Sequence, residues 1–279
     1  MTANADPARA IVTLDHLEKK YGQFTAVDRI SLEVPYGTVF GVLGPNGAGK
    51  TTTLRMITGL LRPTAGSIVI DGHDMDKDPV AAKTITGFIP DRPYIYDKLT
   101  AFEYLRFIGG LYKLSGKMLA GRIPEMLELF ELREWSDTLI ESFSHGMKQR
   151  LVFSGALLPG PKLLVVDEPM VGLDPKGHKL VKSLFRRLAE EEDMTILLST
   201  HTLEVAEEIC DQIVIINHGR IIARGTLSEL RIESGEGDGS LEEVFLRLTE
   251  EKVEERDAAV AERFGKAPAS VEGKDGDLL

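Results

Sequence analysis

One stretch constrains the fold more than any other: the glycine-rich run GPNGAGKT, Gly44–Thr51. It follows the apolar run TVFGVL and precedes TTTLRMITGLL, so it joins a predicted buried strand to a predicted helix. Successive backbone N–H groups in such a loop can point together at a polyphosphate. We expect Lys50 to neutralise the β and γ phosphates, the Thr51 hydroxyl to bind Mg²⁺, and Thr52 to touch the α-phosphate. The predicted nucleotide-binding residues are Gly44, Pro45, Asn46, Gly47, Ala48, Gly49, Lys50, Thr51 and Thr52.

A second run, LLVVDEP, is an apolar strand candidate that ends in two carboxylates, Asp167 and Glu168. Adjacent acids at the end of a buried strand are costly unless a positive or polar group receives them. Mg²⁺ and a water molecule would do so. We therefore expect Asp167 to hold the metal and Glu168 to accept a proton from the water that attacks the γ-phosphate.

The rest of the body alternates β and helical patterns, which predicts a layered α/β fold. Besides TVFGVL and LLVVD, the strand candidates are IVTLDHL, RISLEV, ITGFIP, TILLS and IVIIN. Between Thr100 and Leu158 the pattern becomes helical, with AFEYLRFIGGLYKL and PEMLELFELREW as the clearest helices. We predict a helical subdomain, about residues 95–158, inserted into the β-rich core.

Three further segments complete a resemblance to the nucleotide-binding subunits of ATP-binding cassette (ABC) transporters, over about Ile11 to Leu248. FSHGMKQRL resembles the family signature, VGLDP the loop after the catalytic glutamate, and STH the family's histidine switch. The resemblance implies a P-loop NTPase core with an antiparallel β subdomain and an inserted α-helical subdomain. It also implies an ATPase that uses ATP and Mg²⁺.

The signature itself has a physical basis. Ser144 is a preferred N-cap residue, and the helix predicted after it directs free N–H groups and a positive dipole end outward. Within the family this end meets the γ-phosphate bound by a second cassette, so the resemblance implies that Ser144 and Gly146 act across a dimer. His145 and Met147 depart from the more common Gly and Gln at their positions.

The resemblance assigns roles to three more residues. Tyr21 takes the place of the aromatic residue that stacks on adenine. His201 would hydrogen-bond the γ-phosphate and steady the attacking water. Asp91 stands where the family usually has a glutamine that touches Mg²⁺ and the attacking water. An aspartate keeps an oxygen ligand for the metal but is shorter and adds negative charge near Asp167 and Glu168, so we expect nucleotide binding to depend more strongly on Mg²⁺.

Charge and composition limit the classes of partner that this chain can bind, and they separate a C-terminal segment from the rest of the chain. Residues 233–279 carry 14 Asp or Glu against 6 Lys or Arg, and the whole chain has a net charge of −11. We predict an ABC ATPase domain over residues 1–232, followed by an acidic linker (ESGEGDGS), a short helix (LEEVFLRLTEE) and a disordered tail. The acidic balance argues against direct nucleic-acid binding. A single cysteine, the absence of a secretory signal and the absence of an 18-residue apolar run favour a cytoplasmic protein.

In the family, a helix of a separate membrane subunit docks beside the segment that follows Asp91. This segment carries six of the chain's aromatic residues: Tyr94, Tyr96, Phe102, Tyr104, Phe107 and Tyr112. Some of them could line that docking groove, and packing within the helical subdomain is the alternative. The resemblance implies an integral membrane permease as partner, with this chain on the inner face of the membrane, and the element order favours an exporter. The alternatives are a soluble ATPase that clamps a ribosome or DNA, and a regulator that binds nucleotide without hydrolysis.

Overall fold

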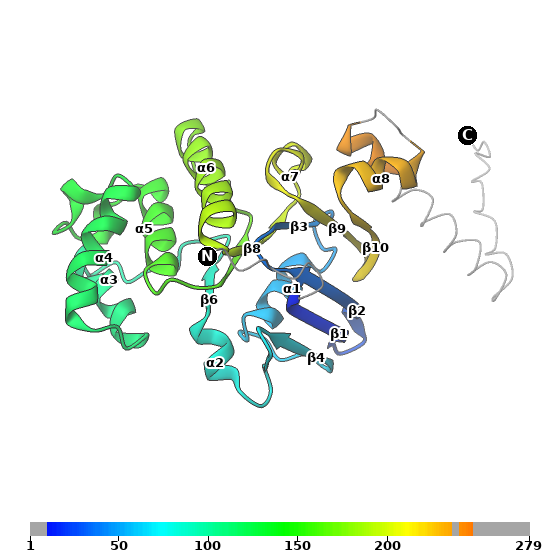
Figure 1. Ribbon diagram of the computed structural model, residues 1–279, viewed down its shortest axis with the longest axis horizontal. Helices are drawn as coiled ribbons and strands as arrows, with labels where there is room; N and C mark the ends of the chain where they lie inside the picture. Colours follow the sequence, from blue (N-terminus) through cyan, green and yellow to red (C-terminus); the bar gives the residue numbers. More distant parts are fainter. Residues whose placement is uncertain (1–9, 236–239, 248–279) are drawn as a thin grey trace, which may run out of the picture.

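The computed structural model describes residues 10–235 and 240–247 and contains two β-sheets with helices around them (Figure 1). The smaller sheet is antiparallel, with the strand order β2-β1-β4-β5. Its strands are β1 (Ala10–Tyr21), β2 (Phe24–Pro35), β4 (Ala65–Ile70) and β5 (His73–Asp74). The predicted strands β1 and β2 are present, whereas the sequence reading missed β4 and β5. The expected antiparallel subdomain is confirmed.

The larger sheet has the order β10-β9-β3-β8-β7-β6 and is parallel except for its edge strand β10. Its strands are β3 (Val39–Leu43), β6 (Thr86–Ile89), β7 (Leu163–Asp167), β8 (Thr195–Thr200), β9 (Gln212–Asn217) and β10 (Arg220–Gly225). Every residue of β3, β7 and β8 is buried, as expected for parallel strands covered on both faces. The apolar runs therefore located these strands correctly, and β10, which pairs only with β9, was missed.

Helices surround this sheet and follow its strands. They are α1 (Lys50–Ile57), α2 (Pro79–Thr84), α3 (Ala101–Leu111), α4 (Gly116–Leu129), α5 (His145–Leu157), α6 (Pro175–Glu192), α7 (Leu203–Ile209) and α8 (Leu227–Ser234), with 3₁₀ turns at Arg133–Trp135 and Ile140–Ser142. The helix predicted from Pro124 begins eight residues earlier, because Ser115 caps its N-terminus and Pro124 lies inside it. None of the helices in the described ranges is both long and apolar enough to cross a bilayer.

Helices α3, α4 and α5 form a helical region at one end of the molecule, drawn in green in Figure 1. Its apolar core is continuous with one face of the parallel sheet, since Phe130 and Phe153 belong to the same buried cluster as Val166 and Leu198. Phe153 of α5 packs against both Phe130 and Phe185 of α6. The inserted helices are therefore packed onto the nucleotide-binding core rather than standing apart from it.

The predicted linker, which was expected to begin at Glu233, does not begin there in the structure. Helix α8 continues to Ser234 and ends at Gly235, so Glu233 is helical rather than part of a linker. Residues 241–247 are also helical, and Leu241 and Val244 are fully buried in a cluster with Leu230 of α8. Residues 236–239, the last four residues of the predicted helix (248–251) and the predicted tail after them lie outside the described residues. The apolar side chains of 241–247 explain this packing, because Leu241 and Val244 join the buried cluster that contains Ile213 and Ile215 of β9 and Ala223 of β10.

Candidate active site

The candidate site lies where three neighbouring parallel strands end. The order β3-β8-β7 places the phosphate loop after β3, His201 after β8, and Asp167 and Glu168 at the end of β7. Carboxyl ends of parallel strands meet at one edge of the sheet, where open α/β folds hold their ligands. Segments that are more than 100 residues apart in the sequence are brought together in this way.

The phosphate loop keeps its shape through glycines in conformations that other residues rarely adopt. Gly47 and Gly49 have φ values of 80° and 108°. A Cβ on Gly49 would lie 2.6 Å from the carbonyl oxygen of Ala26 in β2, so no larger residue fits. The loop is also held by the β9–β10 turn, because Gly219 N–H donates to the Ala48 carbonyl at 2.9 Å.

Lys50 closes the loop from inside. Its ammonium donates to the carbonyls of Gly44 (2.7 Å) and Pro45 (3.2 Å) and lies 3.9 Å from Oε1 of Glu168. Burial lowers the pKa of Lys50, while the charges of Glu168 and Asp167 oppose that shift. A buried cation held only by carbonyls and a distant carboxylate can exchange these partners for an incoming phosphate.

Asp167 is buried at the end of β7 and is held by two hydroxyl groups. Thr51 Oγ1 donates to its Oδ1 at 3.1 Å, and Ser199 Oγ donates to the same oxygen at 2.5 Å. Ser199 lies directly opposite Asp167 in the β7–β8 ladder. The sequence reading gave Ser199 no role of its own. The signal for it was the pairing register of two parallel strands, which is a property of the fold and not of the sequence.

Glu168 and His201 form a hydrogen-bonded pair. His201 Nδ1 lies 2.8 Å from Oε1 of Glu168, and the histidine ring is half exposed while the glutamate is mostly buried. Glu168 adopts a left-handed backbone conformation (φ 53°), and its N–H donates to the Ser199 carbonyl at 3.1 Å. A strained, anchored carboxylate next to an imidazole is an arrangement suited to proton transfer.

Glu168 and His201 line one hollow of 380 Å³, together with loop residues 45–52, Asp91 and two aromatic side chains, Tyr21 and Phe24. Gly44, Asp167 and Ser199 are not among its lining residues. Tyr21 and Phe24 end β1 and begin β2, and both are more than half exposed. The ammonium of Lys19 lies 5.4 Å from the centre of the Tyr21 ring. Tyr21 was expected here, and Phe24, which pairs with it across the β1–β2 turn, was missed.

Ser144 and Gly146 do not line this hollow. Ser144 caps α5 by accepting a hydrogen bond from Met147 N–H at 3.2 Å, and it is exposed. Gly146 adjoins the loop after Glu168, since a Cβ on it would lie 3.5 Å from the carbonyl oxygen of Gly172. The structure thus confirms the N-cap and places the helix end away from the phosphate loop of the same chain.

The donor set at Thr51 and Asp167 fits Mg²⁺, which is commonly bound through a hydroxyl or one carboxylate with phosphate and water completing the shell. Across residues 10–235 and 240–247, no three His, Cys, Asp or Glu side chains gather closely enough to hold a metal ion by themselves. Asp91 lines the same hollow as Thr51 and Glu168. Its part in metal binding stays a prediction.

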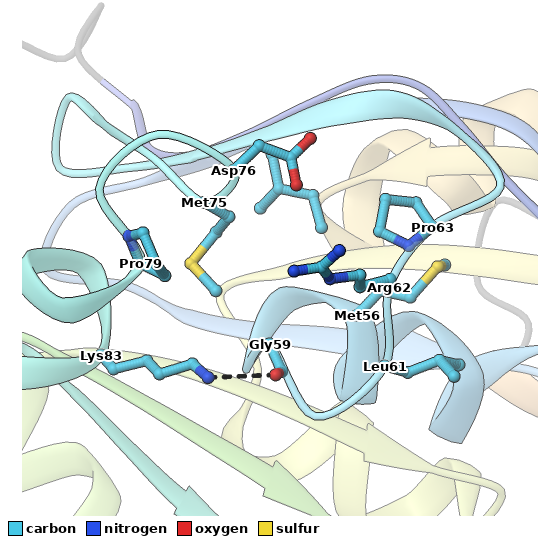
Figure 2. A pocket seen from close by; sticks show the side chains of 10 residues that line it. Met56, Gly59, Leu61, Arg62, Pro63, Met75, Asp76, Pro79 and Lys83 are labelled. Atoms are coloured by element: carbon cyan, nitrogen blue, oxygen red, sulfur yellow. Dashed lines mark hydrogen bonds between the residues drawn. The ribbon is translucent and has the colours of Figure 1, made fainter.

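A second hollow, of 250 Å³, lies between the end of α1 and the β4–α2 region (Figure 2). Met56, Met75 and Pro79 supply apolar walls, and the Lys83 ammonium donates to the Gly59 carbonyl at 3.1 Å. Its lining includes no residue of the phosphate loop or of the ends of β7 and β8. Lys50, Glu168 and His201 line the first hollow and not this one.

The fold and this site define a P-loop α/β ATPase. The family model described as "ABC transporter" matches residues 27–171. The daunorubicin resistance ATP-binding protein DrrA3 of Streptomyces coeruleorubidus is 39% identical over 82% of this chain and 72% of its own length. The Nod factor export ATP-binding protein I of Cupriavidus metallidurans is 38% identical over 79% of this chain and 73% of its own.

Two solved structures match as well. One, described as the ATP-binding subunit of an ABC transporter, aligns with a TM-score of 0.81 at 34% identity over 86% of this chain and 99% of its own. The other, a dimeric ATP-binding cassette bound to ADP and Pi, aligns with a TM-score of 0.71 at 27% identity over 77% of this chain and 98% of its own. The chain belongs to the ABC transporter family: it is an ABC ATPase, whose ATP hydrolysis drives transport.

Proposed function

We propose that this chain drives export by closing with a second copy, or with a homologous cassette, around two ATP molecules. Each phosphate loop would face the α5 N-terminus of the other copy. One observation carries this proposal: Ser144 and Gly146 form the open end of a 13-residue helix, yet they lie outside the hollow that contains Lys50 and Glu168. A helix N-terminus attracts phosphate, so its natural ligand is a nucleotide held by another chain.

The residues of the hollow would divide the work of hydrolysis. Lys50 would leave the Gly44 and Pro45 carbonyls to bind the β and γ phosphates. Glu168 would take the proton of the attacking water, and His201, already bonded to Glu168, would orient that water toward the γ-phosphate. Mg²⁺ held at Thr51 and Asp167 would supply charge neutralisation of the phosphates.

The remaining site residues would set affinity and Mg²⁺ dependence. Tyr21 would stack on the adenine base, with Phe24 offering a second aromatic face at the same mouth. Asp91 would replace the glutamine usual in the family and contact the metal shell or the attacking water. Both assignments rest on position in the hollow and on the resemblance.

The names of the relatives support the proposal of a membrane partner. DrrA3 is named for drug resistance and the Nod factor protein for export, and both are ATP-binding proteins. We propose that this chain likewise binds a separate integral membrane permease and works at the cytoplasmic face of the membrane, without direct contact to nucleic acid. Purification from detergent-solubilised membranes tests this: a co-purifying polytopic protein supports it, and ribosomal or nucleic-acid partners support a soluble clamp instead.

The dimer is tested with Glu168→Gln, which keeps the size of the side chain and removes the base. Full-length Glu168→Gln should form a dimer in ATP and Mg²⁺ that sedimentation can resolve, and hydrolyse ATP slowly. Lys50→Ala, the matched control, should not bind ATP and should stay monomeric. A Glu168→Gln protein that binds ATP but never dimerises, alone or with its permease, would contradict the proposal.

A further inference from the structure

Helix α5 and the loop after Glu168 meet at one tight contact, between His145 and Gly172. A Cβ added to Gly172 would lie less than 3.0 Å from both Nδ1 and Cε1 of the His145 ring. Gly172 has φ 79°, so it already occupies a conformation that favours glycine. The imidazole thus lies where any larger residue at position 172 would place its side chain.

Both sides of this contact are firmly held. On the loop, Val171 N–H donates to the Glu168 carbonyl at 3.2 Å, and Leu173 N–H donates to the Met170 carbonyl at 3.3 Å. Asp174 then caps α6 through Gly177 N–H at 2.7 Å. These hydrogen bonds restrict the movement of Gly172 relative to the carboxylate of Glu168.

The helix side is anchored in the helical region. Ser144 caps α5, and Lys148 in its first turn forms an ion pair with Asp97 at 2.7 Å. Phe143, just before the cap, is buried against Trp135, with ring centres 6.3 Å apart. The His145 side chain is exposed, and its ring contacts Gly172 of the loop.

We propose that His145 is a positioning residue for ATP hydrolysis: its ring, size-matched to Gly172, sets the spacing between the α5 N-terminus and the loop that carries Glu168. This inference rests on the proposed dimer. There the α5 end of one copy binds the nucleotide of its partner, while the Glu168 of the same copy serves its own nucleotide. The His145–Gly172 contact is then the point inside one chain at which the two nucleotide sites adjoin.

The physical consequence is that kcat for ATP hydrolysis should depend on the combined size of the side chains at positions 145 and 172. Misplacing a reacting group by about 1 Å can cost on the order of 100-fold in rate. Gly172→Ala should push the His145 ring, and with it the α5 N-terminus, away from the loop. His145→Gly should remove the contact between the ring and the loop. The double variant, His145→Gly with Gly172→Ala, has a methyl group near the place of the ring. It should therefore recover much of the spacing between the α5 N-terminus and the loop.

The test is a double-variant cycle on the full chain, measuring kcat and the affinity for ATP. We expect each single variant to lower kcat about tenfold or more with ATP affinity unchanged, and the double variant to recover most of the loss. Gly72→Ala is the matched control, because Gly72 has φ 82° with nothing within 4 Å of an added Cβ. It introduces the same backbone strain without displacing a ring.

Additive losses in the double variant, or a His145→Gly protein with wild-type kcat, would overturn the inference. The same variants in the Glu168→Gln background separate it from the proposed function. Suppose that Glu168→Gln dimerises with ATP, and that its dimerisation constant is the same with and without the His145 ring. If the losses of kcat caused by the two single variants are then additive in the double variant, only the inference fails. If Glu168→Gln does not dimerise at all, the proposed function itself fails.

Discussion

Replacing Ser199 by alanine tests how far the catalytic carboxylates depend on β8. The change removes one hydroxyl that donates to Asp167 at 2.5 Å and accepts from Glu168 N–H at 3.3 Å. Asp167 is 1% exposed, so water cannot readily replace the lost donor. Thr51 remains as its second hydroxyl partner.

The magnitude follows from the kind of bond that is lost. A hydrogen bond to a charged group contributes about 1.5–3 kcal/mol, and each 1.36 kcal/mol of barrier is a factor of ten in rate, so kcat should fall about 10- to 160-fold. The free energy of unfolding should fall by a similar amount, about 1.5–3 kcal/mol, because the carboxylate is left under-satisfied.

The assay is steady-state phosphate release at saturating ATP and Mg²⁺, with urea unfolding of the same preparations. Ser154→Ala is the matched control, since Ser154 is equally buried but donates to the Arg150 carbonyl within α5. It should alter stability modestly and leave kcat unchanged. If Ser199→Ala folds and hydrolyses ATP at the wild-type rate, the carboxylates do not depend on this hydroxyl and the reasoning is refuted.

Three further predictions concern single positions around the hollow. Burial lowers the pKa of Lys50 in the folded chain, so the unfolded chain holds that proton to higher pH. Without nucleotide, the free energy of unfolding of the wild type should therefore rise relative to that of Lys50→Met as pH rises through the folded pKa toward 10.5. A difference in urea unfolding that does not change with pH would contradict this. Tyr21→Ala should weaken ATP binding by about 1–3 kcal/mol, whereas Phe24→Ala should do so only if it also stacks; equal, negligible losses measured by calorimetry would remove both from base binding. Asp91→Gln should make nucleotide affinity less dependent on Mg²⁺, and identical titrations of the two proteins would end that proposal.

The nucleotide-binding half of the fold was readable from the sequence because its signals are local. The run Gly44–Thr51 predicted a strand, a loop and a helix; β3 ends directly before it, and α1 begins inside it at Lys50. LLVVD and TILLS predicted β7 and β8, since strands buried on both faces are apolar at nearly every position. That Asp167 and His201 reach one edge follows from parallel pairing, once both strands are placed in one sheet.

What the sequence did not reveal depends on tertiary contacts. Strand β4 was missed because its first half, Ala65–Ser67, lacks the apolar character of a buried strand and is held by pairing with β1. The N-terminal half of α4 was missed because Pro124 looked like a helix start, where proline is well tolerated, although it lies inside the helix. The contacts of Ser199 with Asp167 and of His145 with Gly172 join separate elements, so no local pattern marks them.

The central claim is that each ATP site is built from two chains, and complementation between two inactive variants tests it most directly. Lys50→Ala lacks a working phosphate loop, and Ser144→Arg blocks the α5 end while leaving the loop intact. A 1:1 mixture should regain ATP hydrolysis, because a mixed dimer contains one site made from the intact loop of one chain and the intact helix end of the other. A mixture as inactive as its separate components, with both variants folded and Ser144→Arg still binding ATP, would contradict the account.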